Sequence, residues 1–189
     1  MKPLEILLLN TKGGSCKTTF ALLFADTLQG AKIVNWSPQK DLANAAKFTG
    51  RHMPVSHDKA IASEAPYIIH DTPSFKSIRF HMLVERADLI IIPTRLGTAD
   101  LLSLKTAVAF LREKKAVEKA RIVFCCVRVH SSTYKDYKAY FETNYTDIKR
   151  TKTEIPILDD FERAFEHPVE GEAKQIMVRL VGELGIERK

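Results

Sequence analysis

Five short apolar runs recur along this chain of 189 residues, and each is nearly continuous and contains β-branched residues. Strands of this kind are typical of a parallel sheet that is buried on both faces. Segments with the apolar spacing of helices separate the runs. The alternation predicts an α/β fold, a doubly wound, mainly parallel sheet with helices on both faces. The predicted strands are Leu4–Leu9, Ala31–Val34, Tyr67–Ile69, Leu89–Ile92 and Ile122–Val127.

Helices are expected between and after these strands. Ser131 is placed to cap one of them, and Gly185 to end the last. No repeat, low-complexity tract or linker interrupts the pattern, so we predict a single domain over residues 1–189. The expected helices are Thr18–Leu28, Leu42–Phe48, Asp100–Lys114, Ser131–Asn144, Asp160–Glu166 and Glu172–Leu184.

The composition of the chain indicates where in the cell the protein is expected. No apolar run approaches the ~18 residues of a membrane span, and the N-terminus has no cleavage-site pattern. The three cysteines are an odd number without metal-ligand spacing, so a disulfide framework is not expected. Cys125 and Cys126 lie in an apolar run, which favours small buried thiols. A cytoplasmic location fits these features.

Residues 12–19, KGGSCKTT, directly follow the first predicted strand and open the first helix. Glycines let backbone N–H groups converge on an anion, and the helix N-terminus adds its positive dipole end. Lys17 can then reach the β and γ phosphates of a nucleotide, and the Thr18 hydroxyl can bind Mg²⁺. The standard G-x-x-x-x-G-K-[ST] loop would have glycine where Thr11 and Cys16 stand. A thiol at a helix start can be acidic, although an ordinary buried cysteine is the simpler interpretation.

The loop resembles the deviant Walker A motif of the ParA/MinD family of P-loop ATPases. Residues 67–73, YIIHDTP, are similar to the Walker B strand of that family. Residues 87–94, ADLIIIPT, resemble its next strand, and residues 154–166, EIPILDDFERAFE, resemble the segment before its last helices. The similarity runs along nearly the whole chain. Only a short strand precedes the loop, as in the short plasmid-partition ParA proteins.

The resemblance implies ATP and Mg²⁺ as cofactors. Lys12 would be the signature lysine that crosses to the ATP of the partner subunit in an ATP-dependent homodimer. Its alternatives are contact with its own nucleotide or with solvent. Thr18 and Asp71 would hold Mg²⁺, Asp71 through water, and Asp71 could otherwise be a turn residue before Thr-Pro. The implied catalytic residues are Lys12, Lys17 and Asp71, and the implied nucleotide contacts are Lys12, Gly13, Gly14, Ser15, Cys16, Lys17, Thr18 and Thr19.

Residues 35–39, NWSPQ, stand where the family has Asp-x-Asp-Pro-Gln. Asn35 and Ser37 can hydrogen-bond water, but they cannot accept a proton or attract a cation as a carboxylate does. The resemblance therefore implies ATP binding with weak or absent hydrolysis. Asp41 could substitute for a missing acid, although starting a helix is its simpler role.

Two features remain open in the sequence. The adenine base could lie against Arg128 or against the Pro156–Asp159 loop. The net charge of +6 resides in residues 112–152, where eleven Lys and Arg oppose five Asp and Glu. This excess indicates either non-specific DNA binding or a solvated helix face with a basic loop. The candidate DNA contacts are Lys149, Arg150 and Lys152, with Lys114, Lys115 and Lys119 as alternatives.

The predicted function is a ParA-like DNA-partition ATPase, associated with the nucleoid and acting with a ParB-like centromere-binding adaptor. A non-hydrolysing nucleotide switch of the same fold is one alternative. A MinD-like membrane ATPase is another, and it needs a C-terminal amphipathic helix that can leave the domain. Residues 173–189 are predicted to pack on the domain instead, so no membrane partner is expected. A small-molecule enzyme is the remaining class, and no substrate motif supports it.

Overall fold

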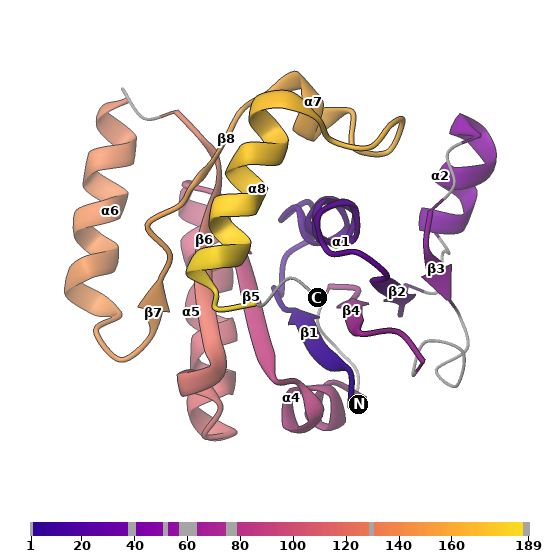
Figure 1. Cartoon of the computed structure of the whole chain (residues 1–189). Coiled ribbons are helices and arrows are strands. Elements are labelled where there is room, and N and C mark those ends of the chain that lie inside the picture. The colour runs from indigo at the N-terminus through magenta and orange to yellow at the C-terminus, as the bar shows by residue number, and fades with distance from the viewer. Residues whose placement is uncertain are drawn as a thin grey trace.

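A parallel β-sheet forms the centre of the molecule in the computed structural model, which describes residues 2–37, 41–50, 53–56, 64–74, 79–128 and 131–186 (Figure 1). The strand order is β3-β2-β4-β1-β5-β6-β7, every neighbouring pair is parallel, and β8 also pairs with β6. The strands are β1 (Leu4–Leu8), β2 (Lys32–Asn35), β3 (Val55–Ser56), β4 (Tyr67–Asp71), β5 (Leu89–Thr94), β6 (Ala120–Val127), β7 (Lys149–Arg150) and β8 (Ile155–Pro156).

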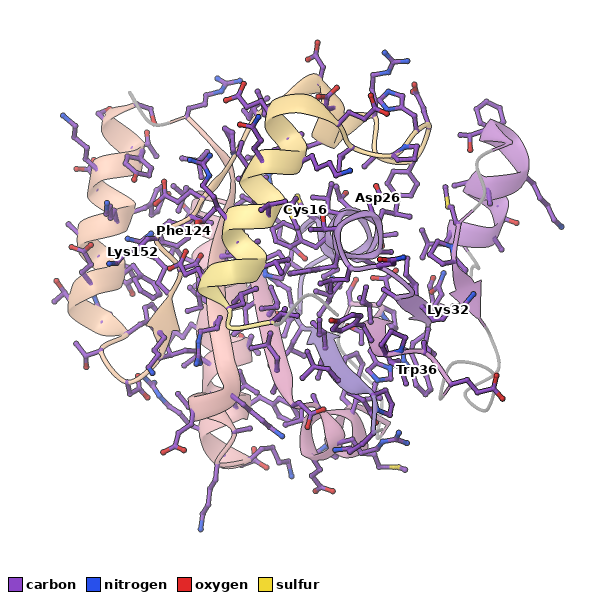
Figure 2. All side chains as sticks on the ribbon, in the orientation of Figure 1. Cys16, Asp26, Lys32, Trp36, Phe124 and Lys152 are labelled. Carbon is purple, nitrogen blue, oxygen red and sulfur yellow. The ribbon has the colours of Figure 1, made fainter. Side chains whose placement is uncertain are left out.

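Helices cover both faces of this sheet, and side chains fill the layers between them (Figures 1 and 2). Successive residues in and directly after β1 face opposite sides: Ile6 and Leu8 lie in one hydrophobic core, whereas Leu7 and Leu9 lie in the other. The doubly wound α/β prediction is therefore confirmed. The helices are α1 (Lys17–Thr27), α2 (Asp41–Thr49), α4 (Arg79–Arg86), α5 (Thr98–Glu113), α6 (Ser132–Asn144), α7 (Asp159–Glu162) and α8 (Gly171–Glu183), with a 3-10 turn η1 (Val117–Lys119).

The five predicted strands are all present, with ends shifted by a few residues. Strands β3, β7 and β8 were not predicted because two residues are too few to give a period. Helix α4 was also missed, although Phe80, Leu83 and Val84 are buried at helical spacing. Helix α7 ends at Glu162 rather than at the predicted Glu166, because turns follow it.

Two predictions for the C-terminal half of the chain are confirmed. The Ser131 side chain caps α6 by accepting a hydrogen bond from the Tyr134 amide at 3.1 Å. The apolar face of α8 is buried on the domain, where it packs beside α1 (Figure 1). In the described part of the chain, every helix falls short of the length and apolar character that crossing a membrane requires.

Candidate nucleotide-binding site

The loop between β1 and α1 lies at the carboxyl edge of the sheet, where open parallel sheets bind ligands. Gly14 has a φ of 71°, in the left-handed region that glycine adopts without cost, and the space beside its Cα is open. Cys16 has a φ of 64° and directly precedes α1, so a residue with a Cβ holds a second left-handed position. The loop residues 13–19 line one cavity of about 360 Å³.

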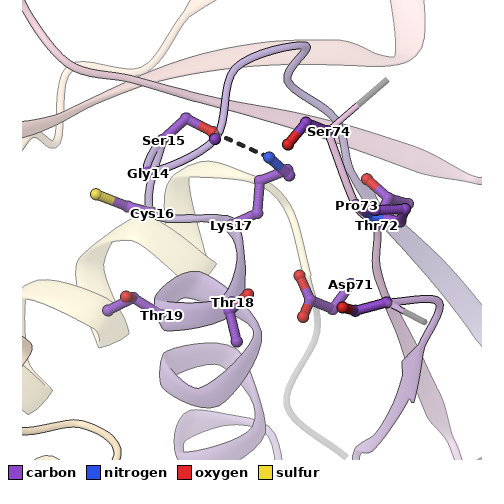
Figure 3. A pocket seen from close by; sticks show the side chains of 12 residues that line it. Gly14, Ser15, Cys16, Lys17, Thr18, Thr19, Asp71, Thr72, Pro73 and Ser74 are labelled. Atoms are coloured by element: carbon purple, nitrogen blue, oxygen red, sulfur yellow. Dashed lines mark hydrogen bonds between the residues drawn. The ribbon is translucent and has the colours of Figure 1, made fainter. Parts of the chain in front are cut away.

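Lys17 is buried inside this cavity, with 6% of its surface exposed. Its ammonium donates hydrogen bonds to the Lys12 carbonyl and the Ser15 hydroxyl, both at 3.1 Å (Figure 3). Burial lowers the pKa of Lys17, and the negative charge of Asp71 partly opposes this effect. Both hydrogen-bond acceptors are neutral, so the loop holds a desolvated cation that an anion would stabilise.

Asp71 ends β4 and is 2% exposed. The sheet places it level with Leu8 of β1 and Asn35 of β2. Its carboxylate points toward Thr18 in the first turn of α1, and both residues line the cavity (Figure 3). A hydroxyl and a carboxylate facing one polar cavity form the oxygen donor set that Mg²⁺ uses beside phosphates.

Thr72, Pro73 and Ser74 complete the far wall of the cavity, and the sequence analysis did not single them out as site residues. They directly follow Asp71, so the Asp-Thr-Pro motif was the signal that could have found them. The Thr72 hydroxyl donates to the Leu8 carbonyl at 2.6 Å, which fixes the end of β4 against the start of the loop.

Lys12 lies at the mouth of the loop and is not among the residues that line the cavity. Its ammonium is 2.9 Å from the Asp100 carboxylate in the first turn of α5. Gly97 leaves room for this carboxylate, because a Cβ on Gly97 would lie 2.9 Å from Asp100 Oδ2. In this structure Lys12 is therefore held by its own chain.

The start of the loop is fixed to α5 and β5 by side chains. Asn10 donates to the Pro93 carbonyl at 2.7 Å, and its Oδ1 accepts from the Lys12 amide at 3.0 Å and from the Ser103 hydroxyl. The hydroxyls of Thr11 and Ser103 are 2.8 Å apart. These contacts couple the position of the loop to the first half of α5.

Asn35 and Ser37 occupy the positions of the missing acids. Asn35 is buried, and its Oδ1 accepts a hydrogen bond from the Ser37 amide at 2.7 Å. Among the described residues, Asn35 Nδ2 has no acceptor. Ser37 lines the cavity together with Asp71. Pro38 and Gln39, the remaining part of the expected motif, lie outside the described residues.

A buried polar chain lies behind Asp71 on β4. Trp36 Nε1 donates to His70 Nδ1 at 3.2 Å, so the proton of the neutral ring sits on Nε2, which faces Glu5 at 3.0 Å. Arg86 donates to the other oxygen of Glu5 at 2.7 Å. Burial raises the pKa of Glu5, but the hydrogen bonds from Arg86 and His70 and the charge of Arg86 outweigh it and lower the pKa. The chain stabilises the strand end that carries Asp71.

A second, more apolar cavity of about 130 Å³ adjoins the first on the other side of Cys16 and Thr19. Phe20, Leu23 and the segment 155–158 line it, together with Cys125 and Cys126. The Pro156–Asp159 loop, a predicted adenine contact, thus reaches this cavity through Pro156, Ile157 and Leu158. Arg128 is exposed after β6, and among the described residues it belongs to the lining of neither cavity.

The candidate DNA-binding residues divide into two groups. Arg150 is engaged within the fold: it bonds Glu154 at 2.8 Å and its guanidinium lies 4.9 Å from the centre of the Phe124 ring. Lys119 donates to the carbonyls of Glu85 and Ala87, which caps α4. Lys114 is half-buried and lies 3.6 Å from the Glu113 carboxylate. The candidates classed as exposed are Lys115, Lys149 and Lys152. The basic cluster in the sequence therefore contains more Lys and Arg side chains than the structure exposes to solvent.

The residues present fit a nucleoside triphosphate with Mg²⁺. The observation is the pairing of a buried ammonium at Lys17, with only neutral acceptors, and a left-handed glycine that leaves the cavity open beside it. Thr18 and Asp71 supply oxygen donors on the same cavity. The adjoining apolar cavity has room beside the loop for part of a planar base.

No protein-family model matches this chain, and no curated protein matches it either. Solved structures do match. The putative plasmid partition protein BB_S35 from Borrelia burgdorferi B31, bound to AMPPNP, has a TM-score of 0.73 at 14% identity, covering 96% of this chain and 98% of its own. A variant of Cyanothece McdA in complex with ATP has a TM-score of 0.72 at 14% identity, with 100% and 98% covered. The MinD cell division protein of Aquifex aeolicus has a TM-score of 0.68 at 13% identity, with 94% and 97% covered.

This chain has the fold of the ParA/MinD-type ATPases. The pNOB8 ParA bound to nonspecific DNA shares it at a TM-score of 0.58 and 13% identity, covering 95% of this chain and 99% of its own. So does cobyrinic acid a,c-diamide synthase from Mycobacterium smegmatis, with bound ATP analog and magnesium, at 0.69 and 11% identity, covering 95% and 93%. The ParA/MinD-type fold thus serves more than one reaction class, and function depends on the site.

Proposed function

We propose that this chain is a ParA-like DNA-partition ATPase that binds ATP and Mg²⁺ in the cavity formed by residues 13–19 and Asp71. The observation that carries the proposal is the convergence of seven consecutive loop residues and one buried carboxylate on a single cavity. The solved structures with this fold include a plasmid partition protein and a ParA bound to nonspecific DNA, which supports the choice of partition as the function to test.

The loop amides and Lys17 would bind the β and γ phosphates, since both present positive charge to the same cavity. Thr18 and Asp71 would hold Mg²⁺, which neutralises phosphate charge when bound. Thr19 and Phe20 would lie under the adenine base, with residues 156–158 beside it. Water would be positioned by Ser37, a neutral hydroxyl, so hydrolysis would be slow.

In this proposal, ATP drives formation of a homodimer in which Lys12 reaches the nucleotide of the partner subunit. The pair with Asp100 must then open, so ATP has to compete with an internal contact. The dimer would bind DNA non-specifically, through exposed lysines such as Lys149 and Lys152. A ParB-like adaptor would stimulate the remaining hydrolysis.

Calorimetry with Mg²⁺–ATP tests the binding step. The wild type should bind ATP, and Lys17→Ala should weaken binding about 10- to 100-fold, because a charge-assisted contact to phosphate is lost. Lys47→Ala, which removes an exposed lysine of α2, is the matched control and should leave affinity unchanged. If the wild type gives no binding heat at high protein concentration, the proposal is wrong.

Measurement of oligomeric state tests the dimer. A non-hydrolysable ATP analogue should produce dimers in the wild type and monomers in Lys12→Ala, whereas ADP should leave both monomeric. Monomers in every condition would contradict the sandwich dimer while leaving nucleotide binding intact.

A second candidate is a nucleotide switch of the same fold without useful turnover. It is favoured by one observation: neutral Asn35 and Ser37 stand beside Asp71, where a carboxylate would accept a proton. Phosphate release with and without DNA separates the two candidates. Tight ATP binding without release above background would leave the switch.

A membrane-bound MinD-like ATPase is disfavoured because the apolar residues of α8, Ile176 and Leu180 among them, are buried on the domain. Sedimentation with anionic liposomes in the presence of ATP is the test. Co-sedimentation that depends on ATP would overturn this part of the proposal.

A further inference from the structure

Three thiols that are far apart in the sequence meet beside the phosphate loop. The sulfur atoms of Cys16, Cys125 and Cys126 all lie within 4.8 Å of one another, and those of Cys16 and Cys126 are 3.6 Å apart. Cys16 precedes α1, whereas Cys125 and Cys126 lie near the end of β6. The sequence spacing gave no sign of this cluster, because only the fold brings the two segments together.

The backbone departs from regular geometry so that the sulfurs converge. Side chains of neighbouring strand residues normally point to opposite faces. Here the pairing of β6 with β8 shifts register between Cys125 and Val127, and Cys125 and Cys126 line the same cavity. Cys126 has a φ of 54° and Cys16 a φ of 64°. A left-handed conformation is strained for a residue with a Cβ, and such strain is concentrated at functional sites.

The spacing of the sulfurs matches a shared metal ion. Zn–S bonds of about 2.3 Å at tetrahedral angles place two sulfurs ~3.8 Å apart. The 3.6 Å separation of Cys16 and Cys126 is close to this value, and Cys125 requires only a small movement. In the nucleotide-free protein, the adjoining cavity of about 130 Å³ leaves space for a fourth ligand from solvent.

The chemistry of the three sulfur ligands distinguishes this cluster from the neighbouring cavity, where Thr18 and Asp71 supply oxygen donors. Thiolate is the form that binds soft metal ions, whereas Mg²⁺ prefers oxygen ligands. The Cys16 sulfur points away from Lys17 and Asp71, so the cluster and the phosphate cavity are separate sites that share one residue (Figure 3).

We propose that Cys16, Cys125 and Cys126 form a three-thiolate binding site for one soft divalent cation of the Zn²⁺ class. The thiol protons pass to solvent as the metal–sulfur bonds form, and no oxidation state changes. A disulfide between Cys16 and Cys126 would instead need an external oxidant, and the sulfurs would have to approach to about 2.05 Å. The metal site therefore requires no oxidant and a smaller movement of the sulfur atoms than the disulfide does.

Titration of the full-length, reduced, nucleotide-free protein with Co²⁺ tests the proposal. We expect one Co²⁺ per chain, with thiolate-to-cobalt charge-transfer absorption that Zn²⁺ abolishes by displacement. Cys16→Gly and Cys126→Gly remove a ligand at positions where glycine suits the left-handed backbone, so both variants should fold. Each should weaken Co²⁺ binding at least tenfold. Lys17→Ala is the control: it removes a phosphate contact and should leave the cobalt spectrum unchanged, which separates this site from the ATP site.

Thiol reactivity provides a readout that needs no variant. One equivalent of Zn²⁺ should protect all three cysteines of the wild type from a thiol reagent. Protection of one cysteine, absence of a charge-transfer band, or a band that persists in Cys16→Gly would overturn the metal site. An intact mass lower by two hydrogens before reduction, together with no cobalt binding after reduction, would replace it with a disulfide.

Discussion

The ammonium of Lys12 and the carboxylate of Asp100 are 2.9 Å apart within one chain, across the junction between the phosphate loop and α5. Asp100 is mostly buried, whereas Lys12 is more than a third exposed. Such a pair contributes about 1 kcal/mol or less. It is therefore strong enough to hold Lys12 and weak enough for a nucleotide phosphate to displace.

Asp100→Asn should release Lys12 and strengthen ATP-dependent dimerisation by up to about 30-fold, because each of the two subunits loses a competing contact of ~1 kcal/mol. Sedimentation velocity with a non-hydrolysable ATP analogue measures the dimer dissociation constant. Asp147→Asn is the matched control, since it breaks the Arg112–Asp147 pair near the other end of α5. A dimer that is weaker in Asp100→Asn than in the control would argue that Asp100 supports the interface directly.

Lys17→Met should raise the free energy of unfolding of the nucleotide-free protein by about 1 kcal/mol, because it replaces a buried, desolvated ammonium with an apolar side chain. Burial lowers the pKa of Lys17 from 10.5 in the folded state. Between that lowered pKa and 10.5 the unfolded chain binds more protons at this site, so the wild type gains stability as the pH rises. Urea denaturation should show the difference between the two proteins shrinking toward pH 10.5, and a constant difference would exclude this cause.

Ser37→Asp should increase ATP turnover about tenfold or more, because a carboxylate on the cavity wall can accept a proton and attract a cation. ATP affinity should change little. Steady-state phosphate release is the measurement. Asn35→Asp is an informative comparison: it buries a second carboxylate level with Asp71, so it should destabilise the nucleotide-free protein. Turnover that stays at the wild-type level in Ser37→Asp would mean that the missing acid is not what limits hydrolysis.

Acid should lower the free energy of unfolding of the protein, partly through Glu5. Its pKa lies below the ordinary value of 4.5 in the folded state, so its contribution to stability is complete above 4.5 and is lost as the pH falls through the folded pKa. Arg86→Ala should cost about 1–3 kcal/mol at neutral pH, since a buried carboxylate loses a charged partner. Chemical denaturation from about pH 7 to about pH 3 would show a flatter acid limb for Glu5→Gln. An unchanged limb would assign the acid sensitivity to other carboxylates.

Binding to DNA should depend on salt with a slope of about −0.9 per neutralised phosphate. Removing the exposed ammonium groups of Lys149 and Lys152 together should reduce that slope by about two such contacts. Arg150→Ala is expected to lower stability more than DNA affinity, because its guanidinium is engaged with Glu154 and Phe124. Fluorescence anisotropy at several salt concentrations measures the slope. An affinity that does not change with salt would contradict DNA binding through these lysines.

The position of the loop before α1 was predictable because its sequence signals are local. A strand, a glycine pair and a helix start occur in consecutive residues, and Lys17 indeed begins α1. The place of Asp71 beside this loop could also be predicted, since the carboxyl ends of parallel strands meet at one edge of the sheet. The position of Lys12 relative to Asp100 could not, because it depends on how α5 packs against the loop.

The thiol cluster and the buried polar chain of hydrogen-bonded side chains behind Asp71 could not be predicted from the sequence. Cys125 and Cys126 were interpreted as small buried thiols, and Cys125 is indeed buried while Cys126 is half-buried. Their closeness to Cys16 was not predicted, because it depends on a register shift in β6. The contact between Glu5 and His70 joins neighbouring strands that are 65 residues apart in the sequence. No period or motif carries such information, because it arises from strand order and register.

The left-handed backbone at positions 16 and 126 sets which amino acids each position accepts. In a library selected only for folding, glycine and asparagine should be enriched at both positions, and valine and isoleucine should be depleted. If selection were made for zinc binding instead, cysteine should return to both positions together. Position 16 would then be constrained from two sides, by the nucleotide that its loop faces and by the metal ion that it shares with position 126 of β6.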